Sequence, residues 1–412
     1  MSVPGSYARS VRLLFSSAFV DGYNLIVIAP ILLILTENGV ALSGWLLGLL
    51  SVSAILGNLV GGLVLGHLGD LFGRRRVLLW DIGFFIAVPI ACALAPSLLL
   101  LALFRFVLGI GIGGNYPLTS VLLSETSGRN VRGRQVALLG VAWTSGALAS
   151  YLLSAVLFPL GSLAIPILLL AVVAPASVVI ILRRRISESD AWGEHMARLS
   201  LADRRKRSSV ALLATPGVRR GTAYAAGFWF LFDVVQYGVS LFLPVLLVAF
   251  GHLRGSQALT LSALLYTGEL AGTIAGLKLV DVLGRRVLQL SGFAAMAAGL
   301  LVAAVVPFSS ATVLLFLLFV VTTGVGVGPG ILEFVYPPEL FPTALRATGS
   351  GFALTMSRVG ASVGVLVVPL LLSPLLGGTH ALFALYGAVA LAAFALTWTL
   401  APETRGTPLP AG

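Results

Sequence analysis

The chain has 412 residues, of which 58% are hydrophobic and only 10% are charged, whereas an ordinary globular chain is about 25% charged. This composition excludes a soluble α/β enzyme and a disordered chain, and the single cysteine, Cys92, excludes a disulfide within the chain. Because a membrane crossing needs about 20 apolar residues, the chain has enough apolar sequence for twelve crossings. We therefore expect an all-α membrane protein.

The apolar sequence falls into two sets of six runs, which predict twelve transmembrane helices. The first set lies at about 12–36, 43–67, 77–96, 98–124, 135–158 and 163–182. The second set lies at about 221–250, 256–280, 287–308, 311–336, 346–373 and 379–401. The predicted domains are therefore an N-terminal six-helix bundle at 1–182, a polar linker at 183–219 and a C-terminal six-helix bundle at 220–412.

The basic residues predict how the helices are oriented. Of the 26 Lys and Arg residues, 23 lie in the N-terminal segment, the linker, the C-terminal tail or alternate loops, and the other loops hold only Arg254. Cytoplasmic loops carry such an excess of positive charge. We therefore expect a multi-pass protein of the cytoplasmic membrane with both termini in the cytoplasm, and the net charge of +11 requires no nucleic-acid partner.

The two halves repeat each other at corresponding places. The loop Asp70-Leu-Phe-Gly73-Arg74-Arg75 recurs 211 residues later as Asp281-Val-Leu-Gly284-Arg285-Arg286. At offsets of 212 to 214 residues, Asp21 matches Asp233, Glu125 matches Glu339 and Arg132 matches Arg346. Chance does not readily supply several matches at nearly the same offset, so the two six-helix bundles are predicted to be pseudo-symmetric.

These motifs resemble those of the major facilitator superfamily over the whole chain. The resemblance rests on the segment from Gly66 to Arg76 and its second copy, on Arg105-x3-Gly109-x3-Gly113, and on Ala401-Pro-Glu403-Thr-Arg405-Gly406, which is similar to the ending of the sugar and metabolite branch. It implies a secondary active transporter, in which two bundles rock about a central site to give alternating access.

The repeated loops are predicted to form a cytoplasmic latch between the halves. A glycine allows the sharp turn, and an aspartate can accept hydrogen bonds from Arg or face a helix N-terminus. The alternative is that the Arg residues only fix the topology. The predicted latch residues are Asp70, Gly73, Arg74, Arg75, Arg105, Glu125, Arg132, Asp281, Gly284, Arg285, Arg286, Glu339 and Arg346, and we also assign Asp81 to this network.

Charged residues deep inside the predicted helices indicate a functional cavity. A charge at bilayer depth costs about 3 kcal/mol, so it persists mainly where it faces a cavity or a partner. An unpaired buried carboxylate has a raised pKa and can carry a proton. The predicted proton-coupling residues are Asp21, Asp233, Glu269 and Glu333. The alternative for any one of them is a structural partner of Arg358 or a bond to the backbone.

Two segments resemble the phosphate:proton symporters of this superfamily. They run from Gly111 to Ser120 and from Trp229 to Tyr237, where Trp229, Asp233 and Tyr237 share one helix face. The resemblance implies a substrate site formed by Asn115, Tyr116, Trp229, Asp233, Tyr237 and Arg358. The chain departs from that family in having Asn115 in place of Asp, Trp143 in place of Gln, Gly330 in place of Asn and Arg358 in place of Lys.

The expected function is proton-coupled symport of a small anion, either inorganic phosphate or an organic acid metabolite. The alternatives are a sugar or polyol:proton symporter and a drug or metabolite exporter on the same fold. No ATP-binding loop, metal-ligand cluster or nucleophile–base pair is present in the sequence, so we expect neither an enzyme, nor a metal site, nor a cofactor. The expected partners are an anionic small-molecule substrate and the lipid bilayer. We expect the protein to be a monomer, and we expect the proton gradient to supply the energy for transport.

Overall fold

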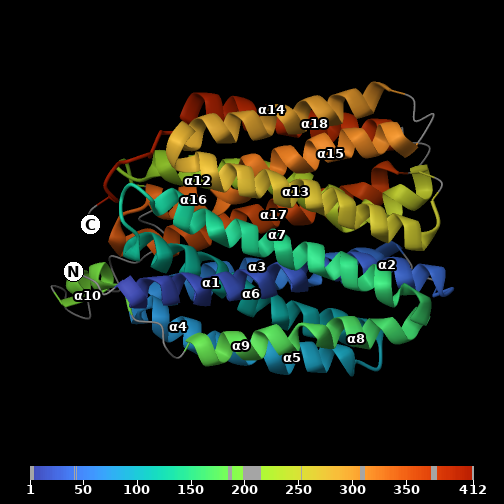
Figure 1. The fold of residues 1–412 in the computed structure, drawn as a ribbon, viewed down its shortest axis with the longest axis horizontal. Coiled ribbons are helices and arrows are strands. Elements are labelled where there is room, and N and C mark those ends of the chain that lie inside the picture. Colours follow the sequence, from blue (N-terminus) through green and yellow to red (C-terminus); the bar gives the residue numbers. More distant parts are fainter. Residues whose placement is uncertain are drawn as a thin grey trace.

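The computed structural model describes residues 4–40, 42, 44–183, 188–197, 215–251, 253–306, 311–372 and 378–410. Within these ranges every regular element is a helix, and the helices lie side by side along the long axis of the molecule (Figure 1). Most of the predicted linker, residues 184–187 and 198–214, lies outside the described residues. The fold class is therefore the all-α class that the sequence predicts.

The first half forms the lower part of Figure 1. Its helices are α1 (Pro4–Ile26), α2 (Ile28–Glu37), α3 (Gly44–Phe72), α4 (Arg74–Trp80), α5 (Phe84–Ala93), α6 (Leu98–Thr126), α7 (Arg132–Leu157), α8 (Ala164–Ala171) and α9 (Val173–Arg183), with short 3-10 turns η1 (Asp81–Gly83) and η2 (Phe158–Leu163). Three expected crossings consist of two helices each, namely α1 with α2, α4 with α5, and α8 with α9.

The second half forms the upper part of Figure 1. It follows the short linker helix α10 (Asp190–Ala197) and consists of α12 (Arg219–Gly251), α13 (Gly255–Leu283), α14 (Arg285–Val305), α15 (Ala311–Val327), α16 (Pro329–Leu340), the 3-10 turn η4 (Thr343–Leu345), α17 (Arg346–Leu371) and α18 (Gly378–Leu400). Here α15 and α16 together form one expected crossing, which is interrupted at Gly328.

The described helices cross the membrane twelve times. Eleven stretches of the described chain are long and apolar enough to span a bilayer, but one of them, Arg132–Ile181, has 50 residues. A straight helix of that length would measure about 75 Å, more than twice the roughly 30 Å of the hydrocarbon core. Gly161, in η2, has a φ of 55° and breaks the helix there. The stretch therefore supplies two crossings, α7 and the pair α8–α9.

The most extensive contacts between the halves are made by two pairs of helices. In one pair α3 lies on α17, and in the other α7 lies on α13. Within the second half, α17 approaches α12 closely because Gly360 and Gly364 face the backbone oxygens of Phe230 and Val234, where a Cβ atom would collide. Small residues allow this close packing of membrane helices. It places the middle of α17 directly beside the middle of α12.

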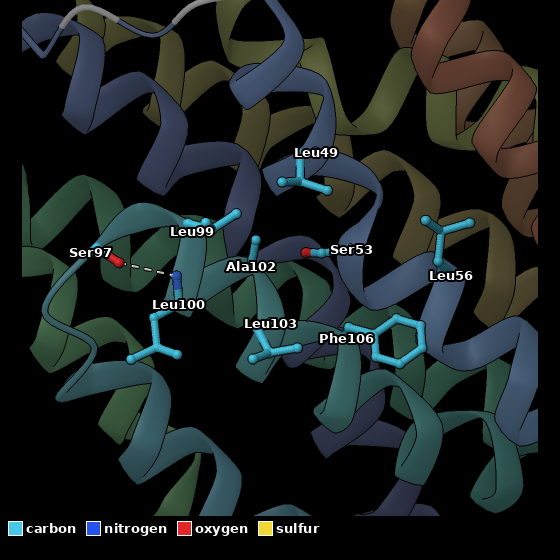
Figure 2. A pocket seen from close by; sticks show the side chains of 9 residues that line it. All are labelled: Leu49, Ser53, Leu56, Ser97, Leu99, Leu100, Ala102, Leu103 and Phe106. Atoms are coloured by element: carbon cyan, nitrogen blue, oxygen red, sulfur yellow. Dashed lines mark hydrogen bonds between the residues drawn. The ribbon is translucent and has the colours of Figure 1, made fainter.

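An apolar groove of about 530 Å³ lies on the outer surface between α3 and α6 (Figure 2). It is lined by Leu49 and Leu56 of α3 and by Leu99, Leu103 and Phe106 of α6, among others. Leu99 and Leu103 are 59% and 54% exposed. No charged side chain lines the groove, so it has the character of a lipid-facing surface. The buried polar and charged side chains cluster elsewhere, between the halves and at one end of the molecule.

Candidate functional site

An ion pair lies at the centre of the molecule. Asp233 of α12 and Arg358 of α17 are 0% and 1% exposed, and Asp233 Oδ2 lies 2.9 Å from Arg358 Nη1. The guanidinium also lies over two aromatic rings, 4.9 Å from the ring centre of Tyr237 and 5.7 Å from that of Tyr116. Such cation–π contacts stabilise a desolvated Arg. Because Tyr116 belongs to α6, this cluster joins the two halves.

Glu333 of α16 extends the same cluster. It accepts hydrogen bonds from the Tyr116 hydroxyl and, at 2.9 Å, from Nε1 of Trp229. The Tyr116 ring stacks on Phe334 at 4.2 Å between ring centres. Five of the predicted substrate residues, Tyr116, Trp229, Asp233, Tyr237 and Arg358, are thus brought together, although their role as substrate ligands stays a prediction.

A small cavity of about 10 Å³, with room for about one water molecule, lies beside the ion pair. Its lining residues are Trp143, Thr144, Phe232, Asp233, Gln236, Tyr237, Glu269, Val325, Gly330 and Glu333. Glu269 reaches it from α13 and accepts long hydrogen bonds from Thr144 and Gln236, at 3.4 and 3.5 Å. Glu269 and Glu333, which the sequence predicts for proton coupling, both line this cavity.

Trp143 of α7 has an indole N–H that lacks a partner. The side chain is 6% exposed and lines the cavity, and its Nε1 forms no hydrogen bond among the described residues. Buried polar groups of folded proteins are nearly always paired. In the sequence Trp143 stands out only as a departure from the phosphate symporters, whereas in the structure its side chain lines the cavity.

A second buried cluster lies within the first half. Asn115 Nδ2 donates to Asp21 Oδ2 at 2.5 Å, and Arg183 of α9 donates to Asn115 Oδ1 and, at 3.0 Å, to the Ser17 hydroxyl. Arg183 Nη1 lies 3.5 Å from Asp81 Oδ2. Asn115 therefore contacts Asp21 and Arg183 and does not line the cavity beside Arg358.

Asp81 and Arg105, which the sequence predicts for the latch, make their contacts elsewhere. Asp81, which was assigned to the latch, pairs with Arg183 instead, because α9 ends close to η1. Arg183 is the first residue of the predicted polar linker, yet its side chain is only 1% exposed. Arg105 is also apart from the latch, since its Nη2 donates to the backbone oxygen of Asn24 at 3.3 Å. The proton role predicted for Asp21 stays a prediction.

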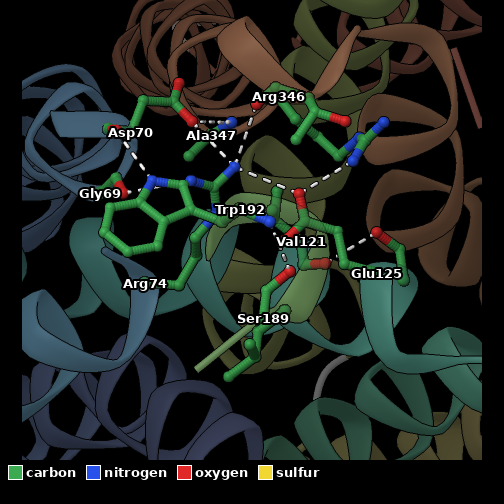
Figure 3. A network of polar contacts seen from close by, with 12 residues as sticks. Gly69, Asp70, Arg74, Val121, Glu125, Ser189, Trp192, Arg346 and Ala347 are labelled. Atoms are coloured by element: carbon green, nitrogen blue, oxygen red, sulfur yellow. Dashed lines mark hydrogen bonds and ion pairs between the residues drawn. The ribbon is translucent and has the colours of Figure 1, made fainter. Parts of the chain in front are cut away.

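The first copy of the repeated loop closes one end of the molecule, which we call the linker end because α10 lies there (Figure 1). Asp70, near the end of α3, accepts hydrogen bonds at 3.3 and 2.7 Å from the backbone N–H groups of Ala347 and Thr348, at the start of α17 (Figure 3). A carboxylate at this place satisfies free donors of a helix and complements its dipole. Asp70 thereby ties the first half to the second.

Ion pairs surround this contact (Figure 3). Arg74 Nη2 lies 3.0 Å from Asp70 Oδ1 and 3.1 Å from Glu125 Oε1, and Glu125 Oε1 lies 2.8 Å from Arg346 Nη1. All four side chains are almost completely buried. These four predicted latch residues are therefore connected to one another across the halves.

The second copy of the loop makes an equivalent set of contacts. Arg285 lies 2.8 Å from Asp281 and 2.9 Å from Glu339. Asp281 accepts a hydrogen bond of 2.8 Å from the backbone N–H of Arg134, at the start of α7 in the other half. Arg132 Nη1 lies 3.7 Å from Glu339 Oε1. Both copies thus cross between the halves at the linker end.

Two further glutamates, whose role the sequence did not reveal, hold the loops in place. Glu188 accepts hydrogen bonds of 3.2 and 3.0 Å from the backbone N–H groups of Arg74 and Arg75. Glu403 accepts bonds of 3.0 and 3.1 Å from those of Arg285 and Arg286. Each glutamate follows the last helix of its half. This shared position is the feature of the sequence that could have identified the two residues as equivalent.

The loop glycines are required by the same geometry. Gly73 and Gly284 have φ values of 100° and 93°, a region that residues with a Cβ rarely adopt. A Cβ at either position would also collide with the carboxylate of Glu188 or Glu403. The predicted turn function of both glycines therefore agrees with their conformation.

Comparison with known proteins gives matches over nearly the whole chain. The family model described as Major Facilitator Superfamily matches residues 14–365. The inner membrane metabolite transport protein YgcS of Escherichia coli is 32% identical over 98% of this chain and 93% of its own length. The niacin transporter NiaP of Acinetobacter baylyi is 28% identical over 89% of this chain and 87% of its own length.

A solved structure shares the fold. The proton:xylose symporter XylE, bound to 6-bromo-6-deoxy-D-glucose, superimposes with a TM-score of 0.81 over 98% of both chains, at 21% sequence identity. This likeness concerns the arrangement of the helices alone.

Proposed function

Because this chain belongs to the major facilitator superfamily, we propose that it is a proton-coupled symporter of a small anion, inorganic phosphate or an organic acid metabolite, by alternating access. The chain is a multi-pass membrane protein and a transporter of small molecules, not an enzyme. In this proposal the proton gradient supplies the energy without a cofactor, and the protein acts as a monomer in the cytoplasmic membrane with the linker end in the cytoplasm.

The buried pair of Asp233 and Arg358 carries the proposal. Asp233 is the only acid within 4.0 Å of the Arg358 guanidinium among the described residues. A proton on Asp233 removes its negative charge and leaves Arg358 free to bind an anion. An anion on Arg358 in turn favours the protonated form of Asp233, because coupling between two binding events is reciprocal. Proton and anion would therefore load together.

The latch supplies the second requirement, a barrier on one side of the site. In this conformation Asp70 and Asp281 each bind the start of a helix in the opposite half. These contacts must break before the linker end can open. The names of two compared proteins, a metabolite transport protein and a niacin transporter, support small organic acids among the candidate substrates.

The proposal is tested with purified protein in proteoliposomes under an inward proton gradient. Asp233→Asn keeps the shape of the side chain but cannot bind and release the proton. We expect this variant to lose gradient-driven accumulation of the anion and to retain exchange of anion across the membrane. Asp190→Asn, at an exposed site in α10, is the matched control. Full accumulation by Asp233→Asn would rule out the proposed coupling.

A further inference from the structure

The central cavity and the ion pair beside it contain more acidic than basic side chains. Three carboxylates line the cavity, those of Asp233, Glu269 and Glu333, and Arg358 is the cation that pairs with one of them. In the part of the chain that the structure describes, neither Glu269 nor Glu333 forms an ion pair. A purely anionic substrate would bind Arg358 but would face two further acids.

The polar contacts of Glu269 leave it able to bind a cationic group. Its partners, Thr144 and Gln236, are neutral and lie at 3.4 and 3.5 Å, at the upper limit of hydrogen-bond distances. Glu333, by contrast, is held by Tyr116 and Trp229 from two helices. Glu269 is therefore the carboxylate of this cavity with the weakest bonds to the protein.

We propose that the substrate is a small zwitterion on a planar frame, with its acid group on Arg358 and its cationic nitrogen on Glu269. This inference rests on the proposed proton-coupled symport and narrows its organic acid substrate to one that also carries a cationic nitrogen. Each charge of such a substrate meets an opposite charge, that of Glu269 at the cavity wall and that of Arg358 beside it. Opposite charges attract each other strongly where water is excluded.

The walls of the site fit a flat ring. Trp143, Phe232 and Tyr237 line the cavity, and Tyr116 and Trp229 lie next to it. Aromatic faces favour offset stacking on planar groups and on cations. The free indole N–H of Trp143 adds a donor for the acid group. Inorganic phosphate has no planar face that could stack on these rings.

The present cavity of about 10 Å³ is too small for a ring, so the substrate must enter after the halves separate. The test therefore measures transport through the whole cycle. Four probes carry the relevant combinations of charge: N-methylpyridinium-3-carboxylate is a permanent zwitterion, benzoate has only the acid, N-methylpyridinium has only the cation, and inorganic phosphate has no ring.

We expect wild-type proteoliposomes with a proton gradient to take up the zwitterion at least tenfold faster than benzoate at equal low concentration. Glu269→Gln should reduce this preference to less than threefold by slowing the zwitterion selectively. The wild-type comparison holds even if the variant does not fold, and Glu333→Gln, which keeps Glu269, should preserve more of the preference than Glu269→Gln does.

Equal uptake of zwitterion and benzoate, or uptake of phosphate alone, would overturn the zwitterion inference and leave anion symport intact. Loss of proton dependence for every acid would overturn the proposed function itself. Preference for N-methylpyridinium over all the acids would overturn both and favour an exporter of cations.

Discussion

Glu125 and Arg346 lie 221 residues apart in the sequence, yet their side chains form an ion pair of 2.8 Å between the two halves. Their counterparts in the repeat, Glu339 and Arg132, approach each other to 3.7 Å. Each half thus supplies the acid of one pair and the base of the other. Closure of the linker end therefore requires the two halves to be aligned so that both ion pairs can form.

Glu125→Gln is expected to shift the protein toward a conformation that is open at the linker end. The change leaves Arg74 and Arg346 buried without their shared carboxylate, and breaking a buried ion pair costs about 3–5 kcal/mol. Loss of even about 3 kcal/mol would change the ratio of closed to open forms roughly 100-fold. The measurement is the rate of thiol labelling of a cysteine introduced at the buried Ser120, in a Cys92→Ser background.

Glu194→Gln serves as the control, because Glu194 is exposed on α10 and should leave the labelling rate unchanged. If Glu125→Gln labels no faster than this control, the ion pair does not hold the linker end closed.

Glu188→Ala and Glu403→Ala are expected to destabilise the protein to a similar extent. Each removes a carboxylate that accepts two backbone N–H groups at the start of α4 or α14, and loss of such a cap costs about 1 kcal/mol. The check is the denaturant midpoint of each variant in detergent. The Glu403 carboxylate also accepts a hydrogen bond from the backbone N–H of Arg405. An unchanged midpoint for Glu403→Ala alone would show that the two caps are not equivalent.

Much of the latch could be predicted from the sequence because it depends on local spacing. Asp70 and Asp281 stand at equal places in two copies of one loop, and each copy must turn at a glycine. Likewise, Trp229, Asp233 and Tyr237 stand four residues apart, which places them on one face of α12. These features follow from helix geometry and from the repeat, and the structure brings the residues together.

The direction of each side chain around its helix could not be predicted. Asn115 and Tyr116 are neighbours, but successive helical residues point about 100° apart, so one contacts Asp21 and the other contacts Glu333. The repeat also shows which residues correspond without showing which residues pair. Arg183 illustrates the limit, because a long side chain at a helix end can turn inward or toward water.

Arg183→Gln is expected to destabilise the first half by about 3–5 kcal/mol, since it leaves Asp81 buried without a cation. Asp81→Asn should destabilise the protein less when it is combined with Arg183→Gln than when it is made alone. A double-mutant cycle of unfolding free energies measures this coupling. Arg220→Gln, at an exposed position, is the control. Additive effects of the two changes would mean that the pair contributes nothing.

Arg358→Gln is expected to raise the apparent KM for an anionic substrate about 10- to 100-fold, because a hydrogen bond to a charged group contributes about 1.5–3 kcal/mol. Arg358→Lys should raise it less, since Lys keeps the charge but lacks the planar guanidinium that lies over Tyr237. Uptake kinetics in proteoliposomes measure both values. The double variant Asp233→Asn/Arg358→Gln removes both charges of the pair, so it should recover the stability that Arg358→Gln loses but not the affinity for the anion. Recovery of affinity in the double variant would show that Arg358 only balances the charge of Asp233 and does not bind the substrate.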